Sequence, residues 1–199
     1  MRQSSLISLL AKELPKKALT HATEVSLGTT AISQKAPLHT FVGASVAVCL
    51  IDTKYSSCGL RQVMLPSLAH GHRHDAMMKA DAALEDVFTQ LCPAGEFSAT
   101  DAEQKRIQAK IFGGADLNAS GLCFSDGVQS VNFVRSWLKT RRIPIVAENI
   151  GGMQRREIVI LPTKGIVYCR TLELDEDFLN EERSRLSEEK QVLNKIELF

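Results

Sequence analysis

The sequence has no long apolar run, no large excess of charge of either sign and no paired cysteines. Its longest apolar stretches are only as long as a strand, which excludes a transmembrane helix. A net charge of +1 gives no reason to expect nucleic acid or an anionic membrane as a partner. The 5 cysteines are scattered and form no Cys-x-x-Cys pair, which argues against a disulfide framework and a structural zinc site. We therefore expect a cytoplasmic protein without membrane insertion.

Two other signals are missing as well. The apolar patch at residues 6–10 lacks the length and the cleavage site of a signal peptide, so none is expected. The glycine pairs at 113–114 and 151–152 lack the lysine and the spacing of phosphate-binding loops. Such pairs serve close backbone approach or tight turning instead. We expect no cofactor and no bound metal.

The sequence does contain 199 residues that are 44% hydrophobic, which is enough for one domain with a substantial core. Apolar residues at helical spacing predict helices, and runs of apolar residues bounded by turn residues predict strands. The expected helices are 4–14, 73–91 and 127–139. The expected strands are one within 22–33, then 40–51, 58–65, 106–112, 143–148, 156–161 and 166–172, with a hairpin-like turn from Pro162 to Gly165.

The last part of the chain, residues 175–199, is rich in charge and has leucines seven positions apart at Leu179, Leu186 and Leu193. We expect a solvated or partly docked helix that is too polar to fill a core. A short coiled-coil contact is the alternative, although the apolar seam spans fewer than three heptads.

Four blocks of the sequence carry motifs. They are TFVGASVAVCL at 40–50, GLRQVMLP at 59–66, AKIFGGA at 109–115 and IPIVAENIGG at 143–152. In the same order and at similar spacing they resemble the T-x-x-G-S-C-V-A-V-C-L, G-M-N-H-F-M-L-P, A-K-V-F-G-G-A and I-P-V-V-A-E-D-L-G-G blocks of the CheD family, the chemoreceptor glutamine deamidases.

The resemblance implies an α+β fold in which mixed β-sheets are flanked by helices. It places this CheD-like domain at residues 24–173, with a helical extension at 1–23 and a charged helical tail at 174–199. It also implies a role in chemotaxis adaptation, with glutamine deamidation on methyl-accepting chemotaxis receptors as the reaction. The partners it suggests are those receptors and a CheC-type phosphatase.

Carried over position by position, the family's nucleophilic cysteine falls on Ser45, its catalytic histidine on Gln62 and a supporting threonine on Thr40. The family's asparagine beside the histidine becomes Arg61, and a later asparagine becomes Ser130. Both members of the catalytic pair are therefore replaced, while the threonine is kept.

Deamidation by this family needs a thiolate that attacks the carboxamide carbon and a histidine that takes and returns the proton. A serine hydroxyl is far less acidic than a thiol, and Gln62 cannot accept a proton at physiological pH. Loss of both groups typically removes several orders of magnitude in rate. We expect Ser45 and Gln62 to fill the pocket and hydrogen-bond each other. Three interpretations stay open: an impaired deamidase, a non-catalytic binding module, and a folded relic.

Other residues could also carry chemistry. His39 would share a strand face with Ser45 but lie roughly 20 Å away unless the chain turns at Gly43. The alternating His70, His72 and His74 suggest a metal site, but a solvated loop entering a helix is the simpler interpretation. Cys49 and Cys58 are expected in the core as small apolar residues.

Overall fold

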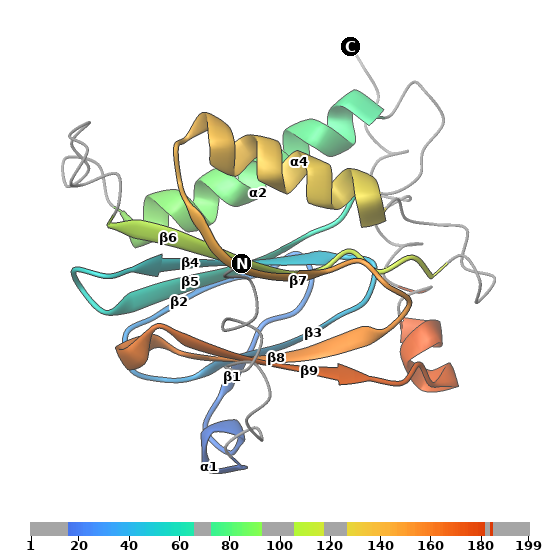
Figure 1. Cartoon of the computed structure of the whole chain (residues 1–199), viewed down its shortest axis with the longest axis horizontal. Coiled ribbons are helices and arrows are strands. Elements are labelled where there is room, and N and C mark those ends of the chain that lie inside the picture. The colour runs from blue at the N-terminus through green and yellow to red at the C-terminus, as the bar shows by residue number, and fades with distance from the viewer. Residues whose placement is uncertain (1–15, 66–72, 93–105, 118–126, 182–183, 185–199) are drawn as a thin grey trace, which may run out of the picture.

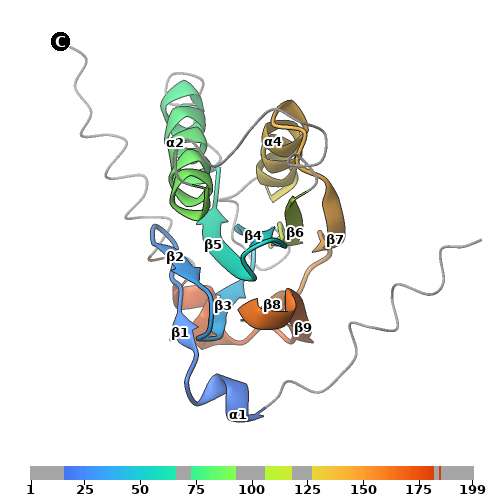
Figure 2. The ribbon, with the colours of Figure 1, turned by 90° about the vertical axis from the view of Figure 1, so that its left-hand side faces the viewer.

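A computed structural model of the chain describes residues 16–65, 73–92, 106–117, 127–181 and 184. These residues form three layers (Figures 1 and 2). A four-stranded sheet stacks on a five-stranded sheet, and two long helices, α2 and α4, cover the outer face of the larger sheet. The α+β class with mixed sheets and flanking helices is confirmed.

The smaller sheet has the strand order β1-β3-β8-β9. Its strands are β1 (Thr23–Glu24), β3 (Leu38–Val42), β8 (Arg155–Leu161) and β9 (Ile166–Leu172). The short helix α1 (Lys16–Leu19) precedes it, and the 3-10 turn η3 (Pro162–Lys164) joins its last two strands. Gly165 closes that turn with a φ of 58°, as the hairpin-like turn requires.

The larger sheet has the strand order β2-β5-β4-β6-β7. Its strands are β2 (Thr30–Ser33), β5 (Ser57–Val63), β4 (Val46–Asp52), β6 (Ile107–Gly113) and β7 (Ile145–Ile150). The helices above it are α2 (Arg73–Leu91) and α4 (Gly127–Thr140). β6 and β7 run parallel, so the chain must cross back between them, and α4 lies in that crossover.

The central strand β4 is buried along its whole length because both of its faces are covered. Val46, Val48 and Leu50 face the helices and belong to a core with α2 and α4. Ala47 and Cys49 alternate with them and face the smaller sheet, in a second core between the two sheets. A continuous apolar run is typical of a strand with two buried faces, and it explains the VAVCLI sequence.

The prediction of one strand over residues 40–51 is wrong. β3 ends at Val42 in the smaller sheet, and β4 begins at Val46 in the larger sheet. Residues 43–45 carry the chain from one sheet to the other. The expected single early strand within 22–33 is likewise two short strands, β1 and β2, one in each sheet. Apolar residues continue on both sides of the crossing, so the sequence pattern does not show that the strand breaks there.

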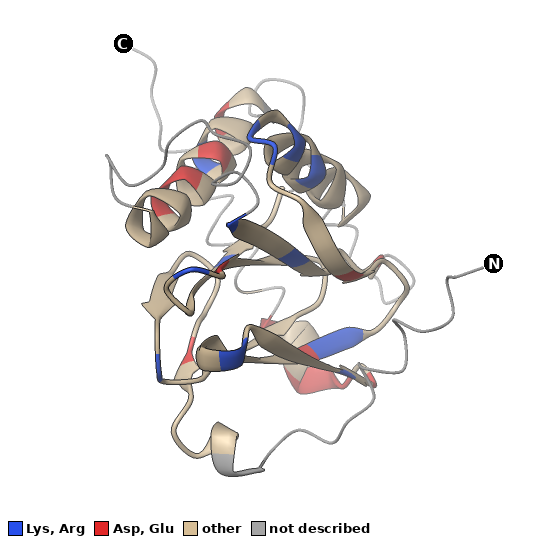
Figure 3. Ribbon diagram, turned by 60° about the vertical axis from the view of Figure 1, so that its left-hand side comes forward, with Lys and Arg blue, Asp and Glu red and all other residues tan. Residues whose placement is uncertain are grey.

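The two long helices and the later strands are confirmed, with shifts of at most two residues at their ends. Charge is segregated on the helical layer, where α2 carries mostly acidic and α4 basic residues (Figure 3). None of the described helices is long and apolar enough to cross a lipid bilayer. The predicted helix at 4–14 lies outside the described residues.

The beginning of the charged tail packs against the domain. Phe178 is 3% exposed and Leu179 is 8% exposed. The expectation that the tail is too polar to contribute to a core is therefore wrong for this turn, and partial docking is confirmed. Leu186 and Leu193, on which a coiled-coil seam would depend, lie outside the described residues.

Candidate functional site

The three residues carried over from the family meet at the end of the molecule where β3 leads into β4. Thr40 lies on β3 and Gln62 on β5, while Ser45 ends the segment that links the two sheets. In the β4–β5 ladder Gln62 stands opposite Ala47, so Ser45 is its diagonal neighbour on the same face. All three side chains lie on the side of their strands that faces the opposite sheet.

Backbone hydrogen bonds hold the linking segment in place. Gly114 donates its N–H to the Ser45 carbonyl oxygen over 2.8 Å, and Ala115 donates to the Gly43 carbonyl over 2.8 Å. Gly113 adopts a φ of +107°, and a Cβ there would overlap the carbonyl oxygen of Ser45. Only glycine suits both the conformation and the close approach. The AKIFGGA block thus positions Ser45.

The side chains form one connected network. The Ser45 hydroxyl donates to Oε1 of Gln62 over 3.0 Å. Nε2 of Gln62 donates to Oγ1 of Thr40 over 2.5 Å and to the carbonyl oxygen of Val25 over 3.1 Å. The Thr40 hydroxyl donates to the same carbonyl over 2.6 Å. The expected Ser45–Gln62 hydrogen bond is confirmed, and Thr40 belongs with them.

The neighbours of Gln62 fix which way its amide points. A backbone carbonyl only accepts hydrogen bonds, so the amide nitrogen must face Val25. Oε1 is then left to face Ser45, whose hydroxyl becomes the donor. Both amide protons of Gln62 and both hydroxyl protons are consumed in this arrangement. The network satisfies itself, as buried polar groups generally do.

This arrangement holds a buried hydroxyl against a group that cannot take its proton. Ser45 is 1% exposed, Thr40 is 1% exposed and Gln62 is 3% exposed. A carboxamide oxygen accepts the hydrogen bond of Ser45 but cannot take its proton at neutral pH. The hydroxyl is therefore held in place by a group that does not activate it as a nucleophile.

Two further positions carried over from the family have structural roles. Ser130 on α4 is 0% exposed, and its hydroxyl accepts a hydrogen bond from the backbone N–H of Leu65 over 2.9 Å. Arg61 donates to the carbonyl of Gly28 and the hydroxyl of Thr30. Arg61 is next to Gln62 on β5, so its side chain leaves the opposite face of the strand. Neither residue joins the network.

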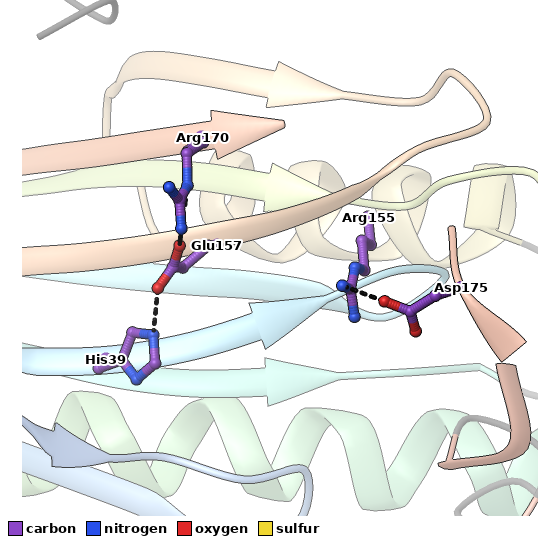
Figure 4. A network of polar contacts seen from close by, with 5 residues as sticks. All are labelled: His39, Arg155, Glu157, Arg170 and Asp175. Atoms are coloured by element: carbon purple, nitrogen blue, oxygen red, sulfur yellow. Dashed lines mark hydrogen bonds and ion pairs between the residues drawn. The ribbon is translucent and has the colours of Figure 1, made fainter. Parts of the chain in front are cut away.

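His39 does not reach Ser45. It lies beside Thr40 on β3 and therefore faces the other way, toward the outer side of the smaller sheet. There its Nε2 lies 3.0 Å from Oε1 of Glu157, and Oε2 of the same carboxylate accepts a hydrogen bond from Nε of Arg170 over 3.0 Å (Figure 4). The shared face predicted for His39 and Ser45 is wrong because the strand breaks between them.

His70 and His72 lie outside the described residues, and His74 lies in the first turn of α2. Within the described part of the chain no group of three or more metal-binding side chains comes together. The three-histidine metal hypothesis thus stays untested.

Cys49, Cys58 and Cys169 do not supply the thiolate that the family's reaction needs. Cys49 and Cys58 are buried in the core between the sheets, as predicted. Burial raises the pKa of the Cys49 thiol well above its ordinary value and raises that of Cys58 to about 12. Burial also raises the pKa of Cys169 to about 11. These thiols stay protonated at neutral pH, and a thiol is a poor nucleophile compared with a thiolate.

Two features of the site were missed from the sequence. The Val25 carbonyl is a backbone group, so no pattern of side chains predicts its role as a hydrogen-bond acceptor. Phe178 and Leu179, from the tail, pack against the segment that precedes Ser45. Leu179 packs with Ala44 and Ala115, next to Ser45. An apolar pair within an otherwise charged segment was the available signal for that docking.

Comparison with known proteins agrees with the motifs. A family model described as CheD chemotactic sensory transduction matches residues 64–171. The chain is similar to the probable chemoreceptor glutamine deamidase CheD 2 of Dechloromonas aromatica (strain RCB), with 32% identity over 189 residues, 89% of this chain and 93% of the relative. The chain belongs to the CheD family. CheD relatives from two other bacteria are also similar to it.

The first is the probable chemoreceptor glutamine deamidase CheD of Xanthomonas campestris pv. campestris (strain B100), 30% identical over 171 residues, 86% of this chain and 77% of the relative. The second is the probable chemoreceptor glutamine deamidase CheD 2 of Shewanella oneidensis (strain ATCC 700550 / JCM 31522 / CIP 106686 / LMG 19005 / NCIMB 14063 / MR-1), 33% identical over 147 residues, 68% of this chain and 69% of the relative. The family model's match begins at Met64, after Thr40, Ser45 and Gln62. Membership in the CheD family therefore rests on more than the pocket.

Proposed function

We propose that this chain is a CheD-type protein of bacterial chemotaxis that engages chemoreceptors in the cytoplasm, and that its glutamine deamidase reaction is impaired. The relatives are named chemoreceptor glutamine deamidases, which supports chemoreceptors as the partner. The hydrogen bond from Ser45 to Oε1 of Gln62 carries the proposal of impairment. It joins the two positions where the family's reaction needs a thiol and a base.

The chemistry shows why both replacements matter. Deamidation forms a bond between the nucleophile and the carboxamide carbon of a receptor glutamine, and the C–N bond then breaks to release ammonia. Water hydrolyses the acyl intermediate and leaves glutamate. One group must take the nucleophile's proton and deliver it to the leaving nitrogen. Gln62 performs neither transfer, and the polar groups around it are already paired.

A binding module without turnover is the second candidate. It would keep the framework that recognises chemoreceptor helices, or a CheC-type phosphatase, and lack the chemical step. The closed network of Ser45, Gln62 and Thr40 favours this candidate, because a bound glutamine side chain would have to break existing hydrogen bonds to enter.

The experiment combines two measurements on the purified full-length chain. Incubation with the cytoplasmic fragment of a chemoreceptor from the same bacterium, followed by mass spectrometry, detects the mass gain of each glutamine converted to glutamate. Co-sedimentation with the same fragment measures binding. We expect binding with no conversion above a no-protein control. Rapid conversion that is lost in Ser45→Ala would contradict the impairment, and absence of binding would contradict the receptor partner.

A further inference from the structure

The chain packs a helical turn of its own against the segment that leads to Ser45. After β9, residues 176–181 are helical. Oδ1 of Asp175 accepts a hydrogen bond from the backbone N–H of Phe178 over 2.8 Å, and its carbonyl accepts from Leu179 over 3.1 Å. An aspartate that satisfies these first N–H groups is an N-cap, so the turn is a built helix start. We call residues 175–181 the covering helix.

The covering helix inserts its apolar side chains beside the nucleophile position. Leu179 packs on a shallow floor of Ala44, Ala115 and Leu117. The Phe178 ring lies so close to Gly43 that a Cβ there would stand 2.9 Å from Cζ of the ring. The small residues at positions 43 and 44 thus make room for the two large ones. Gly43 and Ala44 are in the segment that leads directly to Ser45.

An arginine at the start of β8 holds the covering helix from the other side. Arg155 pairs with Asp175 at 2.5 Å (Figure 4). Its guanidinium also lies over the Phe178 ring, 5.0 Å from the ring centre. Among the described residues its buried Nε has no hydrogen-bond partner. Arginine can grip a carboxylate with two parallel hydrogen bonds, and here Asp175 takes only one nitrogen.

The contact is therefore specific but incomplete. Exposed acidic residues cover its outer side, since Glu176 and Asp177 both face solvent. Within the described part of the tail, the buried side chains are those of Phe178 and Leu179 in one turn, and the Nε atom of Arg155 beside them has no hydrogen-bond partner. Local contacts of this size open far more readily than a domain unfolds.

We propose that the covering helix occupies, in cis, a helix-docking surface at the entrance to the Ser45 pocket, and that the pocket becomes accessible only when this helix leaves. The surface consists of Gly43, Ala44, Ala115 and Leu117, with Arg155 as its charged anchor. Detachment exposes Ser45, which is 1% exposed in the closed form. The inference concerns access to Ser45 and holds whether or not the chain deamidates receptors.

The test uses Ser45→Cys in the full-length chain as a chemical probe. The labelling rate of the introduced thiol by iodoacetamide is followed by mass spectrometry with peptide fragmentation, which assigns the label to position 45 or to Cys49 within their shared peptide. The same digest reports Cys49, which is 0% exposed and labels only when the domain itself opens. Three chains are compared: Ser45→Cys alone, with Phe178→Ala, and with Glu176→Ala as the matched control at an exposed position.

We expect slow labelling at position 45 in the Ser45→Cys chain and in the Glu176→Ala control. Phe178→Ala should raise that rate at least about tenfold while Cys49 stays protected, because it removes the ring that anchors the helix. Equal rates with and without Phe178→Ala, or rapid labelling in the Ser45→Cys chain itself, would overturn the proposal.

A milder variant keeps the test decisive if Phe178→Ala loosens the whole domain and Cys49 labels as well. Asp175→Asn keeps a side chain of the same shape at the start of the helix and removes the charge that pairs with Arg155. Faster labelling at position 45 in this variant, with Cys49 protected, supports the proposal. An unchanged rate counts against it.

Discussion

The hydroxyl of Ser45 donates a hydrogen bond over 3.0 Å to Oε1 of Gln62, an oxygen that accepts hydrogen bonds but not protons at neutral pH. Thr40 and the Val25 carbonyl complete the contacts of the Gln62 amide. The site therefore brings together a hydroxyl, a carboxamide and a second hydroxyl. What it lacks is a group that can carry the proton.

Restoring both family residues should restore part of the activity. A thiol introduced at position 45 stays mostly protonated without a base, because its unperturbed pKa lies near ~8.5. A histidine at position 62 alone faces only a weakly acidic hydroxyl. We expect Ser45→Cys with Gln62→His to release ammonia from a receptor fragment, and each single change to release little. Arg61 is bound to Gly28 and Thr30 on the other face of β5, so its charge does not adjoin the new imidazole.

The measurement for this prediction is ammonia release together with mass spectrometry of the receptor fragment, at equal protein concentration and with folding checked by circular dichroism. A folded double variant that stays inert would show that more than two residues of the pocket have changed.

Removing the Thr40 hydroxyl should destabilise the domain. Thr40→Val keeps the side-chain shape but leaves a proton of the Gln62 amide without its acceptor in a buried site. We expect a loss of about 1–3 kcal/mol in the free energy of unfolding, measured by urea denaturation. Thr140→Val is the control, since the hydroxyl of Thr140 makes an exposed hydrogen bond within α4. A loss no larger than that of the control would mean that the network contributes nothing to stability.

Gly113 should be intolerant of any side chain. Gly113→Ala adds the strain of a positive φ and a direct overlap with the Ser45 carbonyl. Gly28 has a φ of +86° and nothing within 4 Å of an added Cβ, so Gly28→Ala adds strain alone. We expect Gly28→Ala to cost about 1 kcal/mol and Gly113→Ala several times more. Thermal unfolding of the two variants checks this, and equal losses would contradict the close approach.

A carboxylate at position 149 should stabilise the chain. Arg156 is 5% exposed, and its hydrogen bonds to described residues go to Asn149 over 2.9 Å and to the carbonyls of Gln154 and Gly151. All of these partners are neutral, and burial lowers the pKa of Arg156. Asn149→Asp supplies a counterion, so we expect a gain of about 1 kcal/mol at neutral pH.

The gain from Asn149→Asp should depend on pH. Pairing with Arg156 lowers the pKa of the new carboxyl in the folded state, so the stabilisation is present above its unfolded value and is lost as pH falls. Urea denaturation at neutral and acidic pH measures both. A gain in stability that persists in acid would contradict this explanation. As the control, Asn149→Ala removes the hydrogen bond to Arg156 and should be destabilising.

The buried thiols should make the domain less stable in alkali. The pKa of Cys58 is raised from 9.0 to about 12, so the unfolded chain loses this proton at a lower pH than the folded chain. The contribution of Cys58 to the free energy of unfolding is fully present below pH 9.0. It falls by about 1.4 kcal/mol per pH unit as the pH rises toward the pKa of the folded state. Cys58→Ala should remove this contribution and flatten the curve.

Unfolding free energies from neutral pH to about pH 10 test that slope. Leu60→Ala on the same strand is the control, because it removes buried apolar volume without removing a titrating group. We expect Leu60→Ala to be destabilising at every pH with an unchanged slope. An unchanged slope in Cys58→Ala would contradict the prediction.

Local sequence patterns predicted most of the helices and strands. The helix expected at 73–91 has the same bounds in the structure, because its apolar positions repeat at helical spacing and it ends just before Pro93. The motif around Ser45, by contrast, predicted a strand where the chain changes sheets. Gly43 was a sign of a turn there, but Ala44 is small and apolar like the strand residues around it, so the sequence alone did not show that the chain changes sheets.

The site was predicted only in part, because its contacts join residues that lie far apart in the sequence. Strand parity and the family motifs indicated a Ser45–Gln62 contact, but register had to be seen before the diagonal pairing was known. The role of Val25 depends on a carbonyl, which no side-chain pattern encodes. The docking of Phe178 depends on the shape of Gly43 and Ala44, more than a hundred residues earlier in the chain.

The crossing at residues 43–45 has a thermodynamic consequence. Gln62 belongs to the larger sheet, whereas Thr40 belongs to the smaller one, and their hydrogen bond joins the two. The pocket exists only while the two sheets are stacked. A small molecule that bound across it would hold both sheets together, so its binding energy would add to the stability of the whole domain. A rise in unfolding temperature with ligand concentration would therefore be a sensitive way to search for such molecules.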